Sequence, residues 1–198
     1  MKDNLIRVVF LVFIIACLAV NSHAVHGYSL QQNPEYSEDF KDGQAMGWVL
    51  GPGWQIIDDG GNQVLAGEGH QWAHAERTFE DYHLKFSLKL IKGSIHLVYR
   101  INDEGRYFIG FDSSGSKLNK QHWPNTFLDN VVSKNVQHAT NTWHQVEIIG
   151  QGDRLTFIVD GKTEWTHTNS QPILTASFLF ETLVNSHVFD PNTSPEVI

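Results

Sequence analysis

Apolar and polar residues alternate strictly from Tyr82 to Leu90. The apolar set is Leu84, Phe86, Leu88 and Leu90, and polar or charged residues separate its members. Because successive side chains of a strand point to opposite faces, this pattern predicts a half-buried antiparallel strand with one face on a core.

The stretch Gly93–Phe111 predicts a β-hairpin that turns around Asp103, Glu104 and Gly105. On its first strand, one face carries Ile95, Leu97, Tyr99 and Ile101. The other face carries Ser94, His96, Val98 and Arg100. An even-length turn, which we favour, places Tyr107, Ile109 and Phe111 on the face of Arg100, whereas an odd turn with a bulge places them on the opposite face. We therefore expect His96, Arg100 and Tyr107 on the face away from the core.

The rest of the chain continues this β-rich pattern. We expect about twelve short strands with turn signals every 8–12 residues, including the hairpin signal Asp160-Gly161, and no helical period of useful length. The predicted fold is all-β, a two-sheet antiparallel sandwich that forms a single domain over residues 36–198.

The N-terminus has the pattern of an export signal. Lys2 and Arg7 precede an apolar run that ends near Ser22-His23-Ala24. We expect a signal peptide over residues 1–24, a flexible leader over residues 25–35, and a secreted product. The apolar run of about 13 residues is short for a membrane span, so no integral span is expected. The alternative is a lipoprotein anchored through Cys17, the single cysteine of the chain.

Composition and charge exclude one class of partner. The formal net charge is −8 and no basic run occurs, so the chain lacks the clustered cations that bind nucleic acid. After removal of the signal peptide the chain would have no thiol, which excludes disulfides and cysteine nucleophiles. We expect a monomer.

The order of several short motifs along the chain resembles a known superfamily. The motifs are Asp39-Phe40, Gly51-Pro52-Gly53-Trp54, Phe79-Glu80-Asp81-Tyr82, Val98-Tyr99-Arg100, Asn141-Thr142-Trp143-His144, Val159-Asp160-Gly161 and Phe180-Glu181-Thr182-Leu183. Their succession is similar to that of concanavalin A-like, or laminin G-like, jelly-roll domains. Within this superfamily it is close to the bacterial 3-keto-disaccharide hydrolase-like group, which carries the family 16 glycoside hydrolase label.

This resemblance implies two antiparallel sheets, one of them concave, with sugars bound on the concave face or at the rim loops. The chain departs from the family at its end, where Val188-Phe189-Asp190 runs into a segment with Pro191 and Pro195. Proline cannot donate a ladder hydrogen bond, so we expect a last strand that is short, lies at an edge, or is lost.

Catalytic chemistry is weakly indicated by the residues. The jelly-roll glucanases that the chain resembles present their carboxylates in the order E-x-D-x-x-E or E-x-D-x-E along one strand, and no such run occurs here. Glu181 stands alone in an apolar strand, on the face opposite Phe178 and Phe180. We predict no catalytic residues and leave open whether the protein is an enzyme, with preference for a non-enzyme.

Binding chemistry is better indicated. Sugar recognition combines an aromatic face with polar groups aimed at hydroxyls. The candidate ligand-binding residues are Trp72, His96, Arg100, Tyr107 and Glu181. His70 and His74 lie too far apart on a strand to share one ion, so no metal site is predicted there. No cofactor is expected, although a structural calcium ion near Asp39, Asp42 and Asp190 stays an alternative.

Three functions follow from these residues and the resemblance. The first is a secreted, lectin-like module that binds a carbohydrate or glycoconjugate without catalysis. The second is a glycoside hydrolase related to the 3-keto-disaccharide hydrolases. The third is an adhesion module that binds another protein. The sequence does not identify the sugar.

Overall fold

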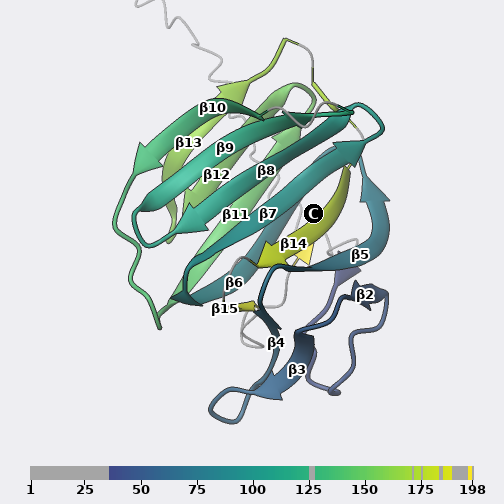
Figure 1. The fold of residues 1–198 in the computed structure, drawn as a ribbon, viewed down its shortest axis with the longest axis vertical. Coiled ribbons are helices and arrows are strands. Elements are labelled where there is room, and N and C mark those ends of the chain that lie inside the picture. The colour runs from purple at the N-terminus through teal and green to yellow at the C-terminus, as the bar shows by residue number, and fades with distance from the viewer. Residues whose placement is uncertain are drawn as a thin grey trace, which may run out of the picture. The chain divides into compact units, whose positions relative to one another are not determined.

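The computed structural model describes residues 36–124, 128–170, 172–174, 176–182, 185–188 and 196–197. In these ranges every regular element is a β-strand, and no helix has the length and apolar character needed to span a bilayer. The strands form two sheets, which Figure 1 shows stacked one in front of the other.

The first sheet has nine strands. They are β1 (Tyr36–Ser37), β3 (Trp54–Asp58), β4 (Gln63–Glu68), β6 (Tyr82–Lys92), β11 (Trp143–Gln151), β12 (Arg154–Val159), β13 (Lys162–Thr168), β15 (Asn185–Val188) and β16 (Glu196–Val197). The main order is β13-β12-β11-β6-β15-β4-β3, and β16 pairs with both β6 and β1. All of its pairings are antiparallel.

The second sheet has seven strands and faces the viewer in Figure 1. They are β2 (Trp48–Leu50), β5 (Gln71–Phe79), β7 (Ser94–Asn102), β8 (Gly105–Asp112), β9 (Gly115–His122), β10 (Leu128–Asn135) and β14 (Ala176–Thr182). Their order is β10-β9-β8-β7-β14-β5-β2, again antiparallel throughout. The predicted all-β sandwich of two antiparallel sheets is confirmed.

The core lies between the sheets. The alternating residues of β6 supply Leu84, Phe86, Leu88 and Leu90, each 4% exposed or less, as the sequence predicts. Phe86 meets Phe180 of β14, with ring centroids 5.4 Å apart, so this pair joins the two sheets directly. The apolar faces of both sheets are thereby removed from water.

The strand expected at Val188 is short, which is one of the expected outcomes, and Phe189 and Asp190 lie outside the described residues. β15 is short, with four residues, but it pairs with both β4 and β6 and thus lies inside its sheet rather than at an edge. The two prolines follow this strand in the sequence, so they remove no hydrogen bond from it.

The hairpin of β7 and β8 contains a bulge that the sequence pattern did not show. Asn102 pairs with Gly105 across a two-residue turn, so the turn is even, as favoured. However, the register shifts between Val98 and Arg100, leaving Tyr99 as an extra residue. One added residue reverses the alternation beyond it, so Arg100 and its partner Tyr107 face the core rather than the outside. The predicted outward position of these two side chains is therefore wrong.

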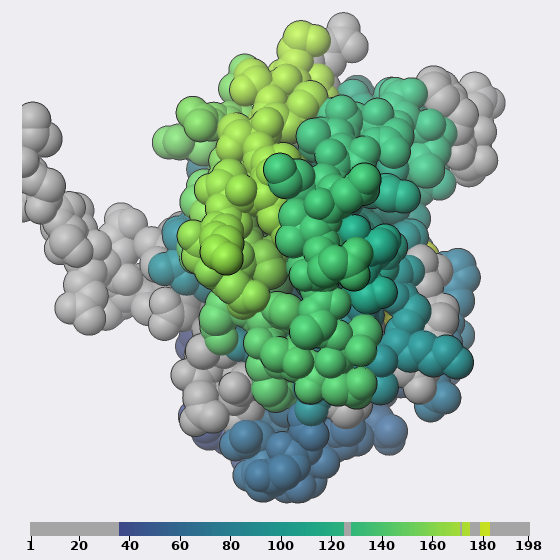
Figure 2. Space-filling model, turned by 90° about the vertical axis from the view of Figure 1, so that its left-hand side faces the viewer, coloured from purple at the N-terminus to yellow at the C-terminus, as the bar shows by residue number. Residues whose placement is uncertain are grey.

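The edge strands β10 and β13 contact each other, which closes one side of the sandwich. This side faces the viewer in Figure 2, where β12 and β13 (yellow-green) lie next to β10 and the segment that follows it (green), and a hollow lies between them. The hollow measures about 280 Å³ and its lining includes His138, His144, Asp160 and Glu164.

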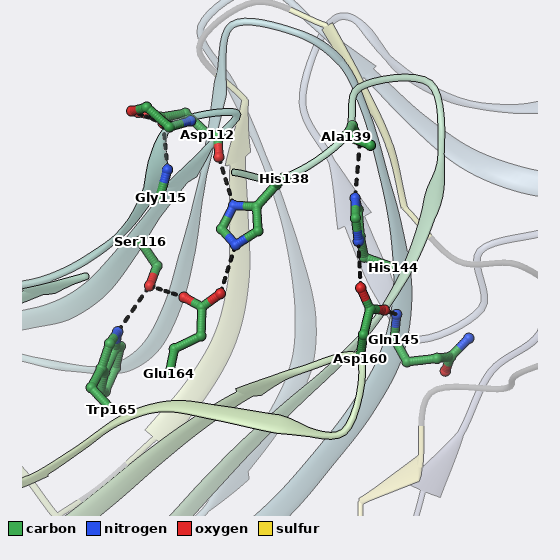
Figure 3. A network of polar contacts seen from close by, with 11 residues as sticks. Asp112, Gly115, Ser116, His138, Ala139, His144, Gln145, Asp160, Glu164 and Trp165 are labelled. Atoms are coloured by element: carbon green, nitrogen blue, oxygen red, sulfur yellow. Dashed lines mark hydrogen bonds and ion pairs between the residues drawn. The ribbon is translucent and has the colours of Figure 1, made fainter. Parts of the chain in front are cut away.

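His138 bridges two acceptors on this side of the sandwich, the carbonyl oxygen of Asp112 and the carboxylate of Glu164 (Figure 3). Its Nδ1 donates to the carbonyl oxygen of Asp112 at 2.7 Å, and its Nε2 lies 2.6 Å from Oε1 of Glu164. Ser116 donates to the other oxygen of Glu164 and accepts from Trp165. His138 and Glu164 have side chains only 3% and 4% exposed, so this ion pair is part of the interior.

His144 lies beside His138 in Figure 3 and makes a second bridge of the same kind. Its Nδ1 lies 2.8 Å from Oδ2 of Asp160, and its Nε2 donates to the carbonyl oxygen of Ala139 at 2.9 Å. Both nitrogens of His138 face oxygen acceptors, an arrangement that suits the doubly protonated ring. The segment that follows β10 is held to β11 and to the β12–β13 turn by these contacts.

We expect Phe86→Ala to lower the free energy of unfolding by about 3–5 kcal/mol, because it leaves a cavity between the two sheets. Chemical denaturation monitored by circular dichroism measures this change. Val49→Ala serves as the control, since Val49 is 43% exposed and its truncation should cost less than about 0.5 kcal/mol. Equal losses in the two variants would contradict the position of the core.

The His138–Glu164 pair predicts a pH dependence of stability. Burial on its own lowers the pKa of His138, but the hydrogen bonds to Glu164 and to the Asp112 carbonyl outweigh it and raise the pKa above 6.5. A raised histidine pKa gives stabilisation that is complete below the unfolded-state value and is lost as the pH rises through the folded-state value. The free energy of unfolding should therefore contain a contribution that declines as the pH rises above 6.5.

Glu164→Gln separates this contribution from that of other histidines, such as His167, whose pKa is lowered by burial. Unfolding titrations of both proteins between about pH 6 and 8 give the two slopes. The variant should lose stability less steeply with rising pH than the wild type. Identical slopes of unfolding free energy against pH in the two proteins would show that Glu164 does not stabilise the protonated form of His138.

Candidate functional site

Three of the predicted ligand-binding residues lie side by side on the outer face of the seven-stranded sheet. Glu181 of β14 pairs in register with Trp72 of β5 on one side and with His96 of β7 on the other. Strand alternation places their neighbours Phe180 and Leu97 in the core, so these three side chains point outward. The structure thus brings Trp72, His96 and Glu181 together.

Glu181 is the centre of this group although it is only 3% exposed. Its Oε1 lies 2.7 Å from Nε2 of His70, and its Oε2 lies 2.9 Å from Nδ1 of His96 and 3.3 Å from Nη1 of Arg106. Both oxygens are therefore covered by cationic or hydrogen-bonding groups, as a buried carboxylate requires.

These contacts set the charge of Glu181. Burial on its own raises the pKa of the carboxyl, but the hydrogen bonds with His96 and His70 and the charge of Arg106 outweigh it and lower the pKa to about 2. Glu181 is consequently an anion at any ordinary pH, and its role is to hold two imidazoles and a guanidinium in place.

Arg106 connects this anion to the aromatic part of the group. Its guanidinium carbon lies 4.8 Å from the ring centre of Trp72 and 5.0 Å from that of Phe108. Its Nε donates to Oε1 of Gln121 at 2.6 Å. Such cation–π contacts fix the orientation of both the arginine and the rings. Trp72, half-buried, is held as a rigid surface next to charged donors.

A small apolar layer supports the group from below. Val98, Phe108 and Leu179 are buried on this outer face, and Trp72 and Ile101 pack against them. The ring of His96 also contacts Phe108, with centroids 4.4 Å apart. His96 and Arg106 therefore stand on a packed base within the sheet, whereas His70 lies in the loop between β4 and β5.

Next to His96, the sheet has a position without a side chain. Gly110 of β8 pairs with His96, and a Cβ atom there would lie 3.7 Å from the ring of His96 and 3.9 Å from the amide nitrogen of Asn119. A Cβ atom at Gly110 would therefore make ordinary van der Waals contact with an imidazole and an amide. A glycine inside a strand is typical of a place where another group approaches the backbone closely.

Sequence reasoning missed Arg106, His70 and Gln121. The two-residue turn was the favoured alternative, but without the Tyr99 bulge it assigned the outer face to Tyr107 instead of Arg106. His70 was considered only as a metal ligand. Trp143 lies half-buried on the outer face of the other sheet, with the Lys89 ammonium 4.9 Å from its ring centre.

The geometry does not support general acid catalysis by Glu181 or a serine catalytic triad. Glu181 is too acidic to serve as a general acid, which needs a raised pKa. Ser116, Glu164 and His138 do not form a catalytic triad, because the serine donates to the glutamate rather than to the histidine and is fully buried.

Metal binding is likewise not indicated by the described residues, among which no group of three or more His, Cys, Asp or Glu side chains is arranged to hold an ion. Of the acids considered for calcium, Asp39 pairs with Lys41 and Asp42 accepts from the backbone of Gln44. Asp190 lies outside the described residues.

No protein-family model matches the sequence, and no curated protein sequence is similar to it. Similarity to solved structures is extensive. A carbohydrate-binding module from Bacillus subtilis, CBM66, aligns with a TM-score of 0.59 at 16% identity, over 73% of this chain and 92% of that one. The β-glucanase of Bacillus licheniformis aligns with a TM-score of 0.61 at 13% identity, over 84% of this chain and 99% of that one.

A glycoside hydrolase family 16 endo-glucanase from Bacteroides ovatus aligns with a TM-score of 0.64 at 12% identity, over 82% of this chain and 99% of that one. At such identities the likeness establishes the fold. The described part of the chain has the concanavalin A-like jelly-roll fold.

Proposed function

We propose that this protein is a carbohydrate-binding module whose site is the outer-face group of Trp72, His70, His96, Arg106 and Glu181. The observation that carries the proposal is the rigid placement of Trp72 beside a buried anion that orients three nitrogen donors. An aromatic face next to fixed hydrogen-bonding groups is the chemistry that sugar rings require.

Each residue has a distinct part in this proposal. Trp72 stacks on the apolar face of a sugar ring. His70, whose side chain is 67% exposed, and His96, which is 20% exposed, meet its hydroxyls. Glu181 is a positioning residue that holds the donors in place. Gly110, which has no side chain next to His96, lets the sugar ring approach the sheet there.

The structural neighbours agree with this class of ligand without deciding the activity. They include a carbohydrate-binding module as well as family 16 hydrolases, so the same fold occurs in binding and in hydrolytic proteins. A glycoside hydrolase is therefore the second candidate. Hydrolysis usually needs two carboxyl groups, one with a raised pKa, whereas Glu181 is the single acid of the outer-face group and has a lowered pKa.

Export belongs to the proposal as well. Residues 1–24 have the charge and apolar pattern of a signal peptide, with the lipoprotein form anchored at Cys17 as the alternative. Both forms would present the module outside the cytoplasm, where polymeric sugars are met. Mass spectrometry of the protein recovered from cells distinguishes cleavage after Ala24 from lipidation.

We expect Trp72→Ala to weaken oligosaccharide binding by at least about tenfold, because it removes the stacking surface. Isothermal titration against a panel of oligosaccharides measures the loss. Trp143→Ala is a matched control, since Trp143 is also half-buried beneath a cation but lies on the other sheet. Equal weakening in both variants, or none in either, would contradict the site.

We expect no cleavage of the sugars that bind. Chromatography of the incubated oligosaccharides should recover them intact over the pH range in which they bind. Glu181→Gln keeps the size of the side chain and removes its charge, so it should weaken binding by loosening His96 and Arg106. Products that appear with the wild type and vanish with Glu181→Gln would instead favour the hydrolase.

A further inference from the structure

Arg100 is a buried cation inside the sandwich, on the opposite face of the sheet from the carbohydrate site proposed above. It is 3% exposed, and its Nη1 donates to the carbonyl oxygen of Gly152 at 2.7 Å. Its Nε and Nη2 have no hydrogen-bond partner. A buried guanidinium with two unsatisfied donors is costly, so this position needs an explanation.

The two unsatisfied atoms define a particular edge of the guanidinium. Nε–H and one Nη2–H are parallel and lie in the plane of the group, and this edge matches the two oxygens of a carboxylate. The Gly152 carbonyl uses the other end of the group and leaves this edge unused. The geometry of the vacant donors is thus that of a bidentate contact with a planar anion.

Tyr107 adds a third donor on the same face. It is the cross-strand partner of Arg100, it is 3% exposed, and its hydroxyl also has no hydrogen-bond partner. Burial raises the pKa of Tyr107 to about 12 despite the opposing charge of Arg100, so the hydroxyl keeps its proton and can donate. Two residues that pair across adjacent strands therefore carry unused donors on the same face of the sheet.

The charged groups around this pair leave room for an anion. The Lys120 ammonium lies 5.4 Å from the ring centre of Tyr107. Asp129 also acts on Tyr107, but its carboxylate is 2.9 Å from His122 and 52% exposed. Tyr82 and Tyr99 complete the surroundings of Arg100 and carry protons, because burial raises the pKa of each.

A hollow reaches this end of the sandwich. It measures about 380 Å³ and is lined by Glu104, Lys120, His122, Pro172 and Ile173. Lys120 is common to the hollow and to the contact with Tyr107, so the hollow extends to the residue that covers the tyrosine ring. Arg100 and Tyr107 are not among its described lining residues, so a small molecule has to pass Lys120 to reach the buried donors.

We propose that Arg100 and Tyr107 form a second binding site, specific for a carboxylate group, inside one end of the sandwich. The carboxylate accepts from Nε and Nη2 of Arg100 and from the hydroxyl of Tyr107. The site is independent of the outer-face site, because the two lie on opposite faces of the seven-stranded sheet. The carboxylate can belong to a free small acid or to an acidic sugar.

Two pairs of probes test the proposal and separate these sources. Sodium acetate is compared with sodium chloride at equal ionic strength, and D-glucuronate with D-glucose. Thermal unfolding and isothermal titration of Trp72→Ala, whose outer-face site is impaired, should show saturable binding of acetate or glucuronate and none of chloride or glucose. Binding of acetate alone identifies a free small acid, and binding of glucuronate alone identifies an acidic sugar.

Variants assign the binding to these side chains. Arg100→Met should weaken carboxylate binding by about tenfold or more, since it removes the bidentate donor. Tyr107→Phe removes only the hydroxyl and should give a smaller loss in a protein that keeps its fold, which covers the case that Arg100→Met does not fold. Arg154→Met, an exposed arginine of β12, is the control and should bind like the wild type.

The proposal is overturned by any of three results. The first is equal thermal unfolding and titration signals with carboxylate and with chloride. The second is carboxylate binding that stays unchanged in both Tyr107→Phe and a folded Arg100→Met. The third is a crystal structure in saturating acetate that shows only water against Nε and Nη2. Loss of oligosaccharide binding in Trp72→Ala has no bearing on these outcomes, so the two sites succeed or fail separately.

Discussion

Every residue of a strand in this sandwich must lie either between the sheets or on an outer face, and the bulge at Tyr99 decides this choice for the β7–β8 hairpin. Before the bulge, His96 and Val98 point outward, and after it Arg100 points inward with Tyr107. Because of the same shift, the side chains of Arg106 and Phe108 point to the outer face. A single extra residue thereby supplies the outer-face group with its arginine and places a different arginine in the interior.

The buried charged residues in the described part of the chain are satisfied to different degrees. Glu181 is in contact with His70, His96 and Arg106, and His138 and Glu164 neutralise each other and bond to further partners. Arg100 has one carbonyl acceptor and two unused donors. Burying an unpaired charge costs several kcal/mol. The contacts of Glu181 and of the His138–Glu164 pair offset this cost, whereas the single contact of Arg100 does not.

Much of the fold could be predicted from local pattern. The alternation in β6, the Asp160-Gly161 turn and the all-β composition follow from the period of a strand and from turn chemistry. Trp72, His96 and Glu181 were each named as candidates, but their position side by side follows from strand pairing that the sequence does not show. The bulge left no mark in the pattern, because Tyr99 and Arg100 occupy the sequence positions of an unbroken alternation. Arg106, Arg100 and Tyr107 were therefore assigned to the wrong faces.

The shared fold cannot by itself distinguish a binding module from a hydrolase, so the argument rests on the state of Glu181. A carboxyl group that catalyses glycoside cleavage as an acid must keep its proton near neutral pH, and the surroundings of such a group are usually apolar. Here two imidazoles and a guanidinium surround the carboxylate and lower its pKa to about 2. The same contacts that make Glu181 a poor acid make it an effective anchor for donors, and this favours recognition over cleavage.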